Sequence, residues 1–598
     1  MNVNEAFHEI FGDSDSGDSD FEEPFLSDSD DDEVGEGTCN FMDGTGGNDN
    51  SDGSDFVNGP GENRQRAARA GDDVAREEAF RRAYQDDWLV NFNHQNGPLL
   101  FDGDEEPTEY GIFSHFFDGE VIDLLVRETN RYAATTIENK GGMDSLSQHS
   151  RFRKWKEVQA NEMKAFLAIM LLMGIDRRSN YELYWTTEWT LEAPGIRSIM
   201  SRDRFYLILT FLHCTDNAHL TRPGDENHDR RGKIKEIMDL LVDRWQTAYY
   251  PDRELSVDET IIPFKGRTAM KVYKPNKPHK WGLNCWNLAE AKTGYVWKSE
   301  LYQGKRNNQT EVGLYHDVVT TLCQPVYNRG HHVYMDNLFT SPTLFDCLSN
   351  HGTGACGTLR TNRVGTPDDI KKAKLKASDP LLSVRDGKAL YVSWFDKRQV
   401  NVVSTVHNAT TFKKNVRARG QNTPRNVDKP VVIECYTKFM GGVDRADQGM
   451  LYYLNIHKTL KWWKKVFVYL LEVSYVNSWI IWKALHPGNR QRPEKFRFAI
   501  VNGLLEGHVR HGGRAGRRST DAPNRLTERH FLTINRDVTP AGRPSKPDCV
   551  VCSNRAVRRH QTEYICIECN KPMCPAPCFR RYHTLMDYKA DCVPGLHK

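Results

Sequence analysis

The sequence predicts a multidomain α/β protein in which a helical domain precedes a mixed β-sheet and a small metal-binding domain ends the chain. Three observations predict this fold class. Apolar residues recur at three- and four-residue spacing from about residue 108 to 250, which is typical of helices. From Leu255 onward, short β-branched and aromatic runs alternate with helical segments, the order of an α/β domain. Finally, seven of the 14 cysteines are concentrated between Cys549 and Cys592.

The N-terminal residues 1–107 are expected to form a disordered acidic tail. Residues 1–60 contain 18 Asp+Glu and no Lys or Arg, and such a segment cannot bury enough surface to offset the entropy of ordering. Because the whole chain has a net charge of +1, the rest carries +19, which suits a polyanionic partner. Ser27 and Ser29 each have an acidic residue three positions later and are candidate kinase sites; a merely solubilising tail is the alternative.

Residues 108–253 are expected to form a helical domain. Asp118 can cap its first long helix, because an aspartate before an apolar-periodic run accepts the first free backbone N–H groups. The further helices are expected at Glu162–Gly174, Arg204–Cys214 and Ile234–Tyr250.

Residues 254–362 are expected to form the first part of an α/β core. A Lys292-Thr293-Gly294 turn joins the second and third of its strands. The expected strands are Glu254–Val257, Leu283–Ala289, Tyr295–Leu301, His332–Met335 and Cys356–Leu359, with helices at Val312–Leu322 and Pro342–Asn350.

The remaining boundaries follow changes in composition. Residues 363–429 hold 15 Lys+Arg against 6 Asp+Glu and are interpreted as a basic insertion domain with strand-like pieces. A strand at Val431–Tyr436 opens the second part of the core, 430–453, and an aromatic-rich helical segment, 454–506, completes the helical domain. Residues 507–547 are interpreted as a basic linker to a cysteine-rich domain at 548–598.

Carboxylates at the ends of predicted elements suggest metal-dependent chemistry. Asp258 is expected to end the first strand and Asp336 the fourth, which would place both at the rim of the sheet. Asp444 follows paired glycines that permit a tight turn into a helix. Phosphodiester chemistry commonly uses two divalent cations about 4 Å apart, which oxygen ligands hold. Taken singly, such aspartates are more often caps, and Asp447 could be a supporting carboxylate or one favoured by the helix dipole.

Several of these segments together resemble the piggyBac transposase family. They are Ser256–Glu259, Tyr273–Pro278, Tyr334–Phe339, Cys356–Arg360 and Met440–Gln448, in that order, and the resemblance extends from about residue 110 to the C-terminus. It implies an RNase H-like core of the retroviral integrase superfamily, interrupted by the insertion domain. It also implies a flanking α-helical DNA-binding and dimerisation domain, with halves from either side of the core, and a small C-terminal zinc domain.

The resemblance further implies cut-and-paste transposition. Asp258, Asp336 and Asp444 match the family's catalytic triad, which would hold two Mg2+ (or Mn2+) ions, and Asp447 matches a fourth acidic position. The implied enzyme is a nuclear homodimer that excises double-stranded DNA at transposon terminal inverted repeats and inserts it at TTAA targets through hairpin intermediates. Trp462 matches an aromatic residue that could stack on an unpaired base. Packing into the core is the alternative, more so for Trp463.

Basic residues near the predicted carboxylate strands are candidates for contacts with the DNA backbone, because lysine and arginine neutralise phosphates and release counterions. They are Lys265, Arg267, Lys274, Lys277, Arg360 and Arg363.

The cysteine cluster predicts structural zinc. Two CxxC pairs, each delivering two thiolates to one tetrahedral ion, are followed by further Cys and His residues. Seven ligands exceed one site, so two zinc ions in a crossed arrangement are expected, with Cys592, His560 or His597 as the eighth ligand. The seven are Cys549, Cys552, Cys566, Cys569, Cys574, Cys578 and His583. Nearby arginines favour DNA recognition by this domain over protein binding.

Two other functions remain open at this stage. One is a domesticated, non-catalytic DNA-binding or chromatin protein that keeps the fold, and the other is a structure-selective nuclease. No apolar run approaches the roughly 18 residues of a membrane helix, and the first residues do not resemble a secretory signal. A nuclear or cytosolic protein without a membrane partner is therefore expected.

Overall fold

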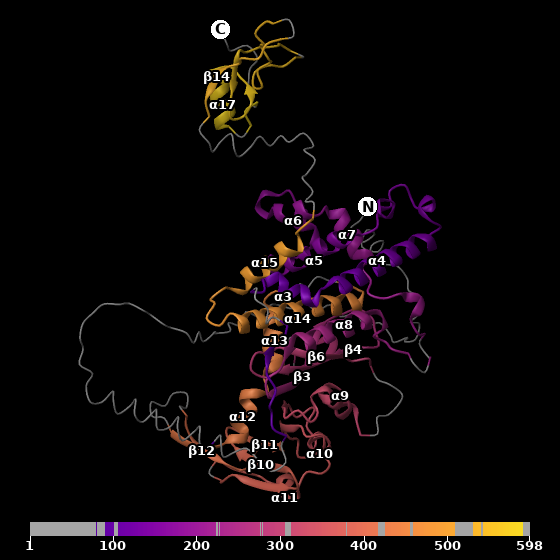
Figure 1. The fold of residues 1–598 in the computed structure, drawn as a ribbon, viewed down its shortest axis with the longest axis vertical. Coiled ribbons are helices and arrows are strands. Elements are labelled where there is room, and N and C mark those ends of the chain that lie inside the picture. Colours follow the sequence, from indigo (N-terminus) through magenta and orange to yellow (C-terminus); the bar gives the residue numbers. More distant parts are fainter. Residues whose placement is uncertain are drawn as a thin grey trace, which may run out of the picture. The chain divides into compact units, whose positions relative to one another are not determined.

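The computed structural model describes residue 79 and residues 90–100, 106–508 and 530–589, with short gaps at 223–224, 226–227, 276, 278, 305–311, 378, 417–424, 455–458, 540–541, 556 and 586. The chain divides into two compact units, Met1–Arg510 and His511–Lys598, which are described separately (Figure 1). Within the described residues, no helix is both long and apolar enough to cross a membrane.

The first unit contains the predicted helical domain. Its helices are α3 (Glu109–Phe116), α4 (Gly119–Asn139), α5 (Ala160–Ile175), α6 (Pro194–Ile199), α7 (Arg202–Phe211) and α8 (Gly232–Ala248). Asp118 caps α4 as predicted, because its carboxylate accepts from the Val121 amide at 3.0 Å. Two helices from the far end of the unit, α14 (Trp462–Leu485) and α15 (Pro493–Leu504), pack against α3, α5 and α8.

A buried ion pair joins these two sets of helices. Arg497 of α15 is fully buried and binds Glu472 of α14 through two hydrogen bonds of 2.8 and 2.6 Å. The same guanidinium donates to the Leu171 carbonyl of α5 at 2.9 Å. The two sequence-distant parts of the helical domain therefore share one core.

The sheet of the first unit is mixed and has nine strands. Their order is β4-β5-β3-β7-β8-β11-β10-β9, and β6 also pairs with β5. β7 lies parallel to β3 and to β8, whereas the other pairs are antiparallel. The first-part strands are β3 (Glu254–Pro263), β4 (Lys271–Tyr273), β5 (Trp281–Glu290), β6 (Val296–Leu301), β7 (His332–Met335) and β8 (Gly354–Thr358), with helices α9 (Leu314–Cys323) and α10 (Pro342–Asn350).

Only part of the predicted insertion, residues 363–429, is separate from the core sheet. Strands β9 (Leu382–Asp386), β10 (Ala389–Phe395) and β11 (Gln399–Ser404) follow the short helix α11 (Asp368–Lys372) and extend the core sheet. The link is the pairing of Val402 with Thr358 and of its neighbours along β8. Only β12 (Thr411–Val416) and β13 (Arg425–Pro430) form a separate two-stranded sheet among the described residues of this segment.

Two local predictions were wrong. Val431–Tyr436 is not a strand but lies in helix α12 (Val431–Phe439). The first three residues of this helix, all β-branched and apolar, are buried, and Glu434 binds Lys414 at 2.9 Å and Lys429 at 2.6 Å. Packing and ion pairing here outweigh β propensity. Asp258 does not end its strand, because β3 continues to Pro263 through its long pairing with β5.

The expected disorder of the tail was wrong for residues 90–100. β1 (Gly97–Pro98) pairs with β2 (Tyr249–Tyr250), and the Phe92 ring lies 5.0 Å from that of His331. Both contacts fix this segment against the sheet. The acidic part of the tail, including Ser27 and Ser29, lies outside the described residues.

The second unit begins before the predicted cysteine-rich domain. β14 (Leu532–Ile534) lies in the predicted linker, yet it pairs with β15 (Tyr564–Cys566), which in turn pairs with β16 (Lys571–Pro572). Helix α17 (Cys578–Thr584) completes the unit. Eight buried residues form its small core, and five of them are cysteines.

Candidate active site and metal sites

Asp258 and Asp336 lie side by side on neighbouring parallel strands. Val257 of β3 is in register with Met335 of β7, and the residue that follows each of them is an aspartate. Adjacent strands are about 4.8 Å apart, and residues in register point to the same face. Asp258 is therefore brought beside Asp336 although it lies within its strand, and Asp336 follows the end of β7 as predicted.

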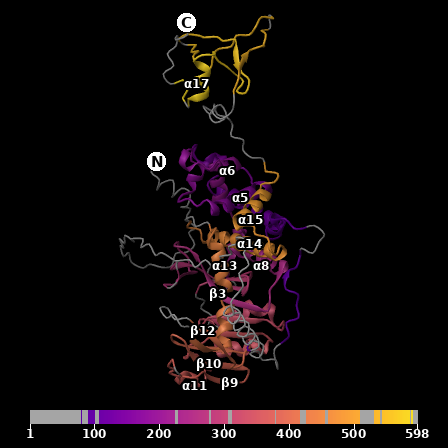
Figure 2. The same cartoon turned by 90° about the vertical axis from the view of Figure 1, so that its left-hand side faces the viewer.

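Helix α13 (Gly442–Leu451) brings Asp444 to the same place. Its first residue packs so closely on β3 and β5 that a side chain at Gly442 would collide with Ser256 and approach the Glu290 carbonyl. Asp447, one turn later, accepts a 2.6 Å hydrogen bond from Thr260. Ser256, Asp258 and Thr260 lie on the same face of β3, because side chains two positions apart share a face. Gly442 contacts Ser256 and Asp447 contacts Thr260, one on each side of Asp258. Asp444 lies between Gly442 and Asp447 on the helix. In Figures 1 and 2, α13 lies beside β3.

The pKa values of Asp258 and Asp336 reflect their burial and the charges near them. Burial raises the pKa of Asp258 to about 7, Lys277 opposes the rise, and the charges of Asp336 and Asp444 add to it. Burial also raises the pKa of Asp336, with Glu259 adding to the rise and Arg360 opposing it. Burial is thus the main cause of both shifts, and the neighbouring carboxylates add to it.

Asp447 belongs to a buried polar network that anchors α13. Burial raises its pKa to about 7, with the Thr260 hydrogen bond opposing the rise. Thr260 accepts from Asn287 Nδ2 at 2.8 Å, and Asn287 Oδ1 accepts from Tyr469 at 3.1 Å and from Ser299. The network links β3, β5, β6, α13 and α14, so it fixes the orientation of the helix that carries Asp444.

Four predicted basic residues lie at this cluster. Lys274 forms an ion pair with Glu259 at 3.1 Å, and Lys277 donates to the Glu259 carbonyl at 3.4 Å. Arg360 donates to Asn337 Oδ1 at 2.8 Å, while Arg363 donates to the carbonyls of Asn337 and Leu338. The two arginines therefore hold the loop after Asp336.

The other predicted DNA-binding residues do not contact the neighbours of the aspartates in any interaction described above. Lys265 and Arg267 are exposed beyond the end of β3. Trp462 begins α14 and is half-buried against the core, whereas Trp463 is 5% exposed. Core packing was expected more for Trp463 than for Trp462, and Trp463 is the more deeply buried of the two.

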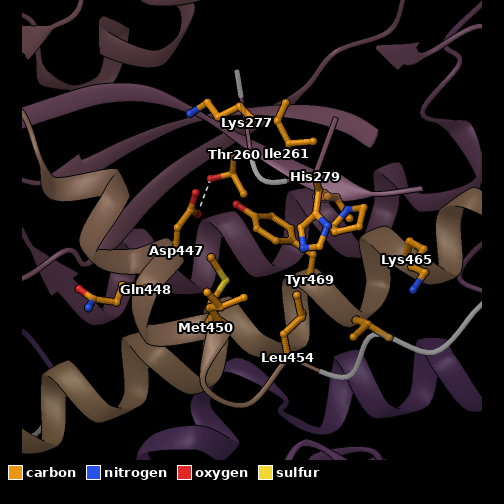
Figure 3. A pocket seen from close by; sticks show the side chains of 14 residues that line it. Thr260, Ile261, Lys277, His279, Asp447, Gln448, Met450, Leu454, Lys465 and Tyr469 are labelled. Atoms are coloured by element: carbon orange, nitrogen blue, oxygen red, sulfur yellow. Dashed lines mark hydrogen bonds between the residues drawn. The ribbon is translucent and has the colours of Figure 1, made fainter. Parts of the chain in front are cut away.

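A pocket of about 370 Å³ opens beside Asp447 (Figure 3). Thr260 and Asp447 face each other at one end of it, and Lys277, His279 and Lys465 contribute nitrogen atoms. The remaining wall is apolar except for Gln448 and the Tyr469 ring, and comes from β3, α13 and α14. No pattern in the sequence indicates this pocket, since its walls come from segments that lie far apart along the chain.

The second unit gathers eight potential zinc ligands into two clusters. Cys549, Cys552, Cys574 and Cys578 form one, and His530, Cys566, Cys569 and His583 form the other; within each, the ligand atoms lie within 4.8 Å of one another. The ligand pairs alternate between the clusters along the sequence. All seven residues predicted as ligands therefore take part in this crossed arrangement.

The eighth residue is His530, which the sequence analysis missed because it lies in the predicted linker. Its Nδ1 is 3.3 Å from Cys569 Sγ. The candidate His560 instead places Nδ1 3.5 Å from Cys574 Sγ, beside a cluster that already has four thiols. Cys592 and His597 lie outside the described residues. The histidine tautomer also fits, because His583 Nδ1 lies 2.8 Å from the Phe579 carbonyl and leaves Nε2 for the metal.

Comparisons with known proteins agree with this architecture. A family model described as "Transposase IS4" matches residues 108–479, and one described as a "DDE_Tnp_1-like zinc finger" matches residues 527–584. A cryo-EM structure of a piggyBac transposase synaptic complex with hairpin DNA has a TM-score of 0.62 at 22% identity, over 80% of this chain and 98% of that one. The fold is thus that of a transposase.

Two human proteins are also similar. PiggyBac transposable element-derived protein 3 is 27% identical over 497 residues, covering 80% of this chain and 76% of the relative. PiggyBac transposable element-derived protein 2 is 26% identical over 494 residues, covering 80% and 77%. Since the transposase model spans more than half of the sequence, the chain belongs to the piggyBac family of transposases.

Proposed function

We propose that the protein is an active DNA transposase that cuts and rejoins DNA at Asp258, Asp336 and Asp444. The observation that supports the proposal is the placement of Asp258 beside Asp336 on adjacent strands, with the helix that carries Asp444 packed on β3 although these residues are far apart in the sequence. One rival function is that of a non-catalytic DNA-binding protein. Such a protein would have no need of buried carboxylates, whose charge is unfavourable for stability.

The residues fit a pair of Mg2+ ions. The donor set consists of hard carboxylate oxygens, which are the ligands that Mg2+ prefers, and burial disfavours their charge in the absence of a cation. Asp258, Asp336 and Asp444 would hold the ions. When bound, two such ions activate the attacking oxygen and stabilise the leaving oxygen of an in-line displacement.

The chain's own side chains position the DNA and the carboxylates. Asp447, through Thr260, fixes α13 and with it Asp444. Arg360 and Arg363 hold the loop that follows Asp336, and Lys277 lies within electrostatic reach of Asp258 and Asp447. Lys265, Arg267, Lys274 and Lys277 are proposed to contact the phosphate backbone, and Trp462 to stack on an unpaired base.

The domain roles follow from the same proposal. The strand order β6-β5-β3-β7-β8, with β7 and β8 parallel to β3, supports an RNase H-like core. Residues 108–253 and 454–506 are proposed to bind DNA and to mediate dimerisation. The second unit, holding two structural Zn2+ ions, is proposed to recognise transposon end DNA. The substrates would be terminal inverted repeats and TTAA targets, in the nucleus.

Purified full-length protein tests the proposal. It is incubated with Mg2+ and a duplex carrying the inverted repeats that flank its coding region, and the products are resolved on a denaturing gel. Nicked and hairpin-ended products that are absent with Asp258→Asn support the enzyme. Binding without cleavage supports the domesticated DNA-binding protein. Cleavage that does not depend on end sequence supports a structure-selective nuclease.

A further inference from the structure

We infer that Tyr273 and Trp281 form a stacking platform for unpaired bases of a DNA strand that leads away from the carboxylate cluster. The inference rests on the proposed function, since it assumes that DNA reaches this face of the sheet. It assigns a role to an exposed aromatic pair at the β4–β5 hairpin, outside the carboxylate cluster and the pocket.

The two aromatic residues form a pair that the fold leaves open. Tyr273 and Trp281 are directly opposite each other on β4 and β5, and their ring centroids are 4.7 Å apart with planes at 44°. Tyr273 is 50% exposed and Trp281 45%, whereas Trp286, farther along β5, is only 5% exposed. Exposing two such large rings at one point is costly unless a ligand covers them.

The register places this pair on the same face as the catalytic carboxylates. Asp258 is opposite Asn287 on β5, and Trp281 lies six positions before Asn287, so both point to one face. Phe264 donates its backbone amide to the Trp281 carbonyl at 3.3 Å, which fixes the position of Trp281 along β3. A strand of about six residues spans about 20 Å, the distance from Asp258 to the platform along the sheet.

Cations line the path between the two sites. Thr260 and Ile262 lie on that face between Asp258 and the platform, and both line the pocket, together with Lys277 and Lys465. At the platform, Lys271 Nζ lies 5.1 Å from the centre of the Trp281 ring. An anionic strand could therefore meet a positive side chain at each end of the path.

This combination fits a single DNA strand better than a protein. Proteins that bind single strands combine a cationic groove with aromatic rings on which successive bases stack. The bases of intact duplex stack on one another and are not available to these rings. Protein interfaces, by contrast, are depleted in lysine at their centre. The rise in stacked duplex is about 3.4 Å per nucleotide and an unpaired strand extends farther, so a path of about 20 Å corresponds to at most about six nucleotides from the reacting phosphate.

The test uses full-length, zinc-loaded protein and fluorescein-labelled dT oligonucleotides of about 4 to 16 nucleotides, the range of site sizes for single-strand binding domains, with fluorescence anisotropy and no added Mg2+. Trp281→Ala and Tyr273→Ala should each weaken binding of the longer oligonucleotides by about 5- to 150-fold, the range expected for the loss of one stacked base. Trp281→Phe should retain most of the affinity. Leu100→Ala, which removes a 49% exposed apolar side chain from the segment before the helical domain, is the control and should bind as the parent does.

Length dependence tests the placement of the platform. With duplexes that carry single-stranded tails of increasing length, the effect of Trp281→Ala should be absent without a tail and should appear once the tail spans about 20 Å, at no more than about six nucleotides. Equal binding by Trp281→Ala and the parent at every length would overturn the inference. So would a change in sedimentation mass without a change in binding, which would identify a protein contact instead.

The two proposals fail in different ways. If the parent binds neither duplex nor oligonucleotide, both the proposed function and the platform are refuted. If the parent cleaves its terminal repeats while Trp281→Ala still binds oligonucleotides normally, only the platform is refuted.

Discussion

Asp258→Asn should stabilise the metal-free protein while abolishing cleavage. The substitution keeps the shape of the side chain and an oxygen that can accept the 2.8 Å hydrogen bond from the Glu259 amide. It removes the charge that burial and the neighbouring carboxylates disfavour, the cause of the rise in the pKa of Asp258 from 3.8 to about 7.

The sign and size of the effect follow from that rise. Because the folded protein binds the Asp258 proton more tightly than the unfolded chain, this contribution to stability is complete below about pH 4 and is lost as the pH rises through 7. At about 1.36 kcal/mol per pKa unit, the loss at pH 8 is about 4 kcal/mol. With an unfolding entropy of about 2.1 cal/mol/K for each of roughly 400 residues, it corresponds to about 5 °C in melting temperature.

Differential scanning fluorimetry of the zinc-loaded protein without added Mg2+, from pH 5 to 8, measures this difference in melting temperature. At pH 8 Asp258→Asn should melt about 5 °C above the parent, with the difference shrinking toward pH 5. Mg2+ should raise the melting temperature of the parent more than that of the variant, because binding to the folded state stabilises it. The exposed Asp123→Asn is the control and should match the parent throughout. Coincident parent and Asp258→Asn curves at every pH would refute the clustering of carboxylates.

Three further outcomes are expected. His530→Ala should lower the zinc content, measured by plasma mass spectrometry, from about two ions per chain toward one, whereas His560→Ala should retain both; equal loss would contradict the assignment of His530. Arg497→Ala should destabilise the protein by about 3–5 kcal/mol in urea unfolding, because it leaves the Glu472 charge buried without its partner; a change under about 1 kcal/mol would show that water reaches the pair. Arg363→Ala should lower cleavage about tenfold or more while leaving duplex affinity within twofold, since Arg363 holds the loop after the fourth strand; a parallel loss of affinity would make it a DNA contact instead.

Local patterns were enough to predict most of the secondary structure. Asp118 caps its helix, and Pro342–Asn350 is a helix with the predicted bounds, because capping and apolar spacing are properties of neighbouring residues. Val431–Tyr436 was wrongly predicted as a strand. The helix there depends on burial against the sheet and on ion pairs between Glu434 and the lysines of the β12–β13 hairpin. The position of Asp258 in the middle of a strand likewise depends on pairing with β5, which a local pattern does not contain.

In the candidate site, too, the residues with a local pattern were predicted and those that depend on contacts between distant segments were not. The residue types and the resemblance picked out the aspartates and seven potential zinc ligands, but not their partners in space. Thr260, Asn287 and Tyr469 support Asp447 through contacts between distant segments, and no spacing in the sequence indicates them. His530 escaped notice because a histidine without a nearby cysteine pair has no metal-binding pattern of its own.

The docking of α13 on β3 has a consequence for protein synthesis. During translation, the strands bearing Asp258 and Asp336 leave the ribosome well before the glycine-led helix that supplies Asp444. A nascent chain, or one cut short by a premature stop codon, would carry only part of the ligand set. If the three aspartates act together as proposed, cutting would await synthesis of about the first three quarters of the chain.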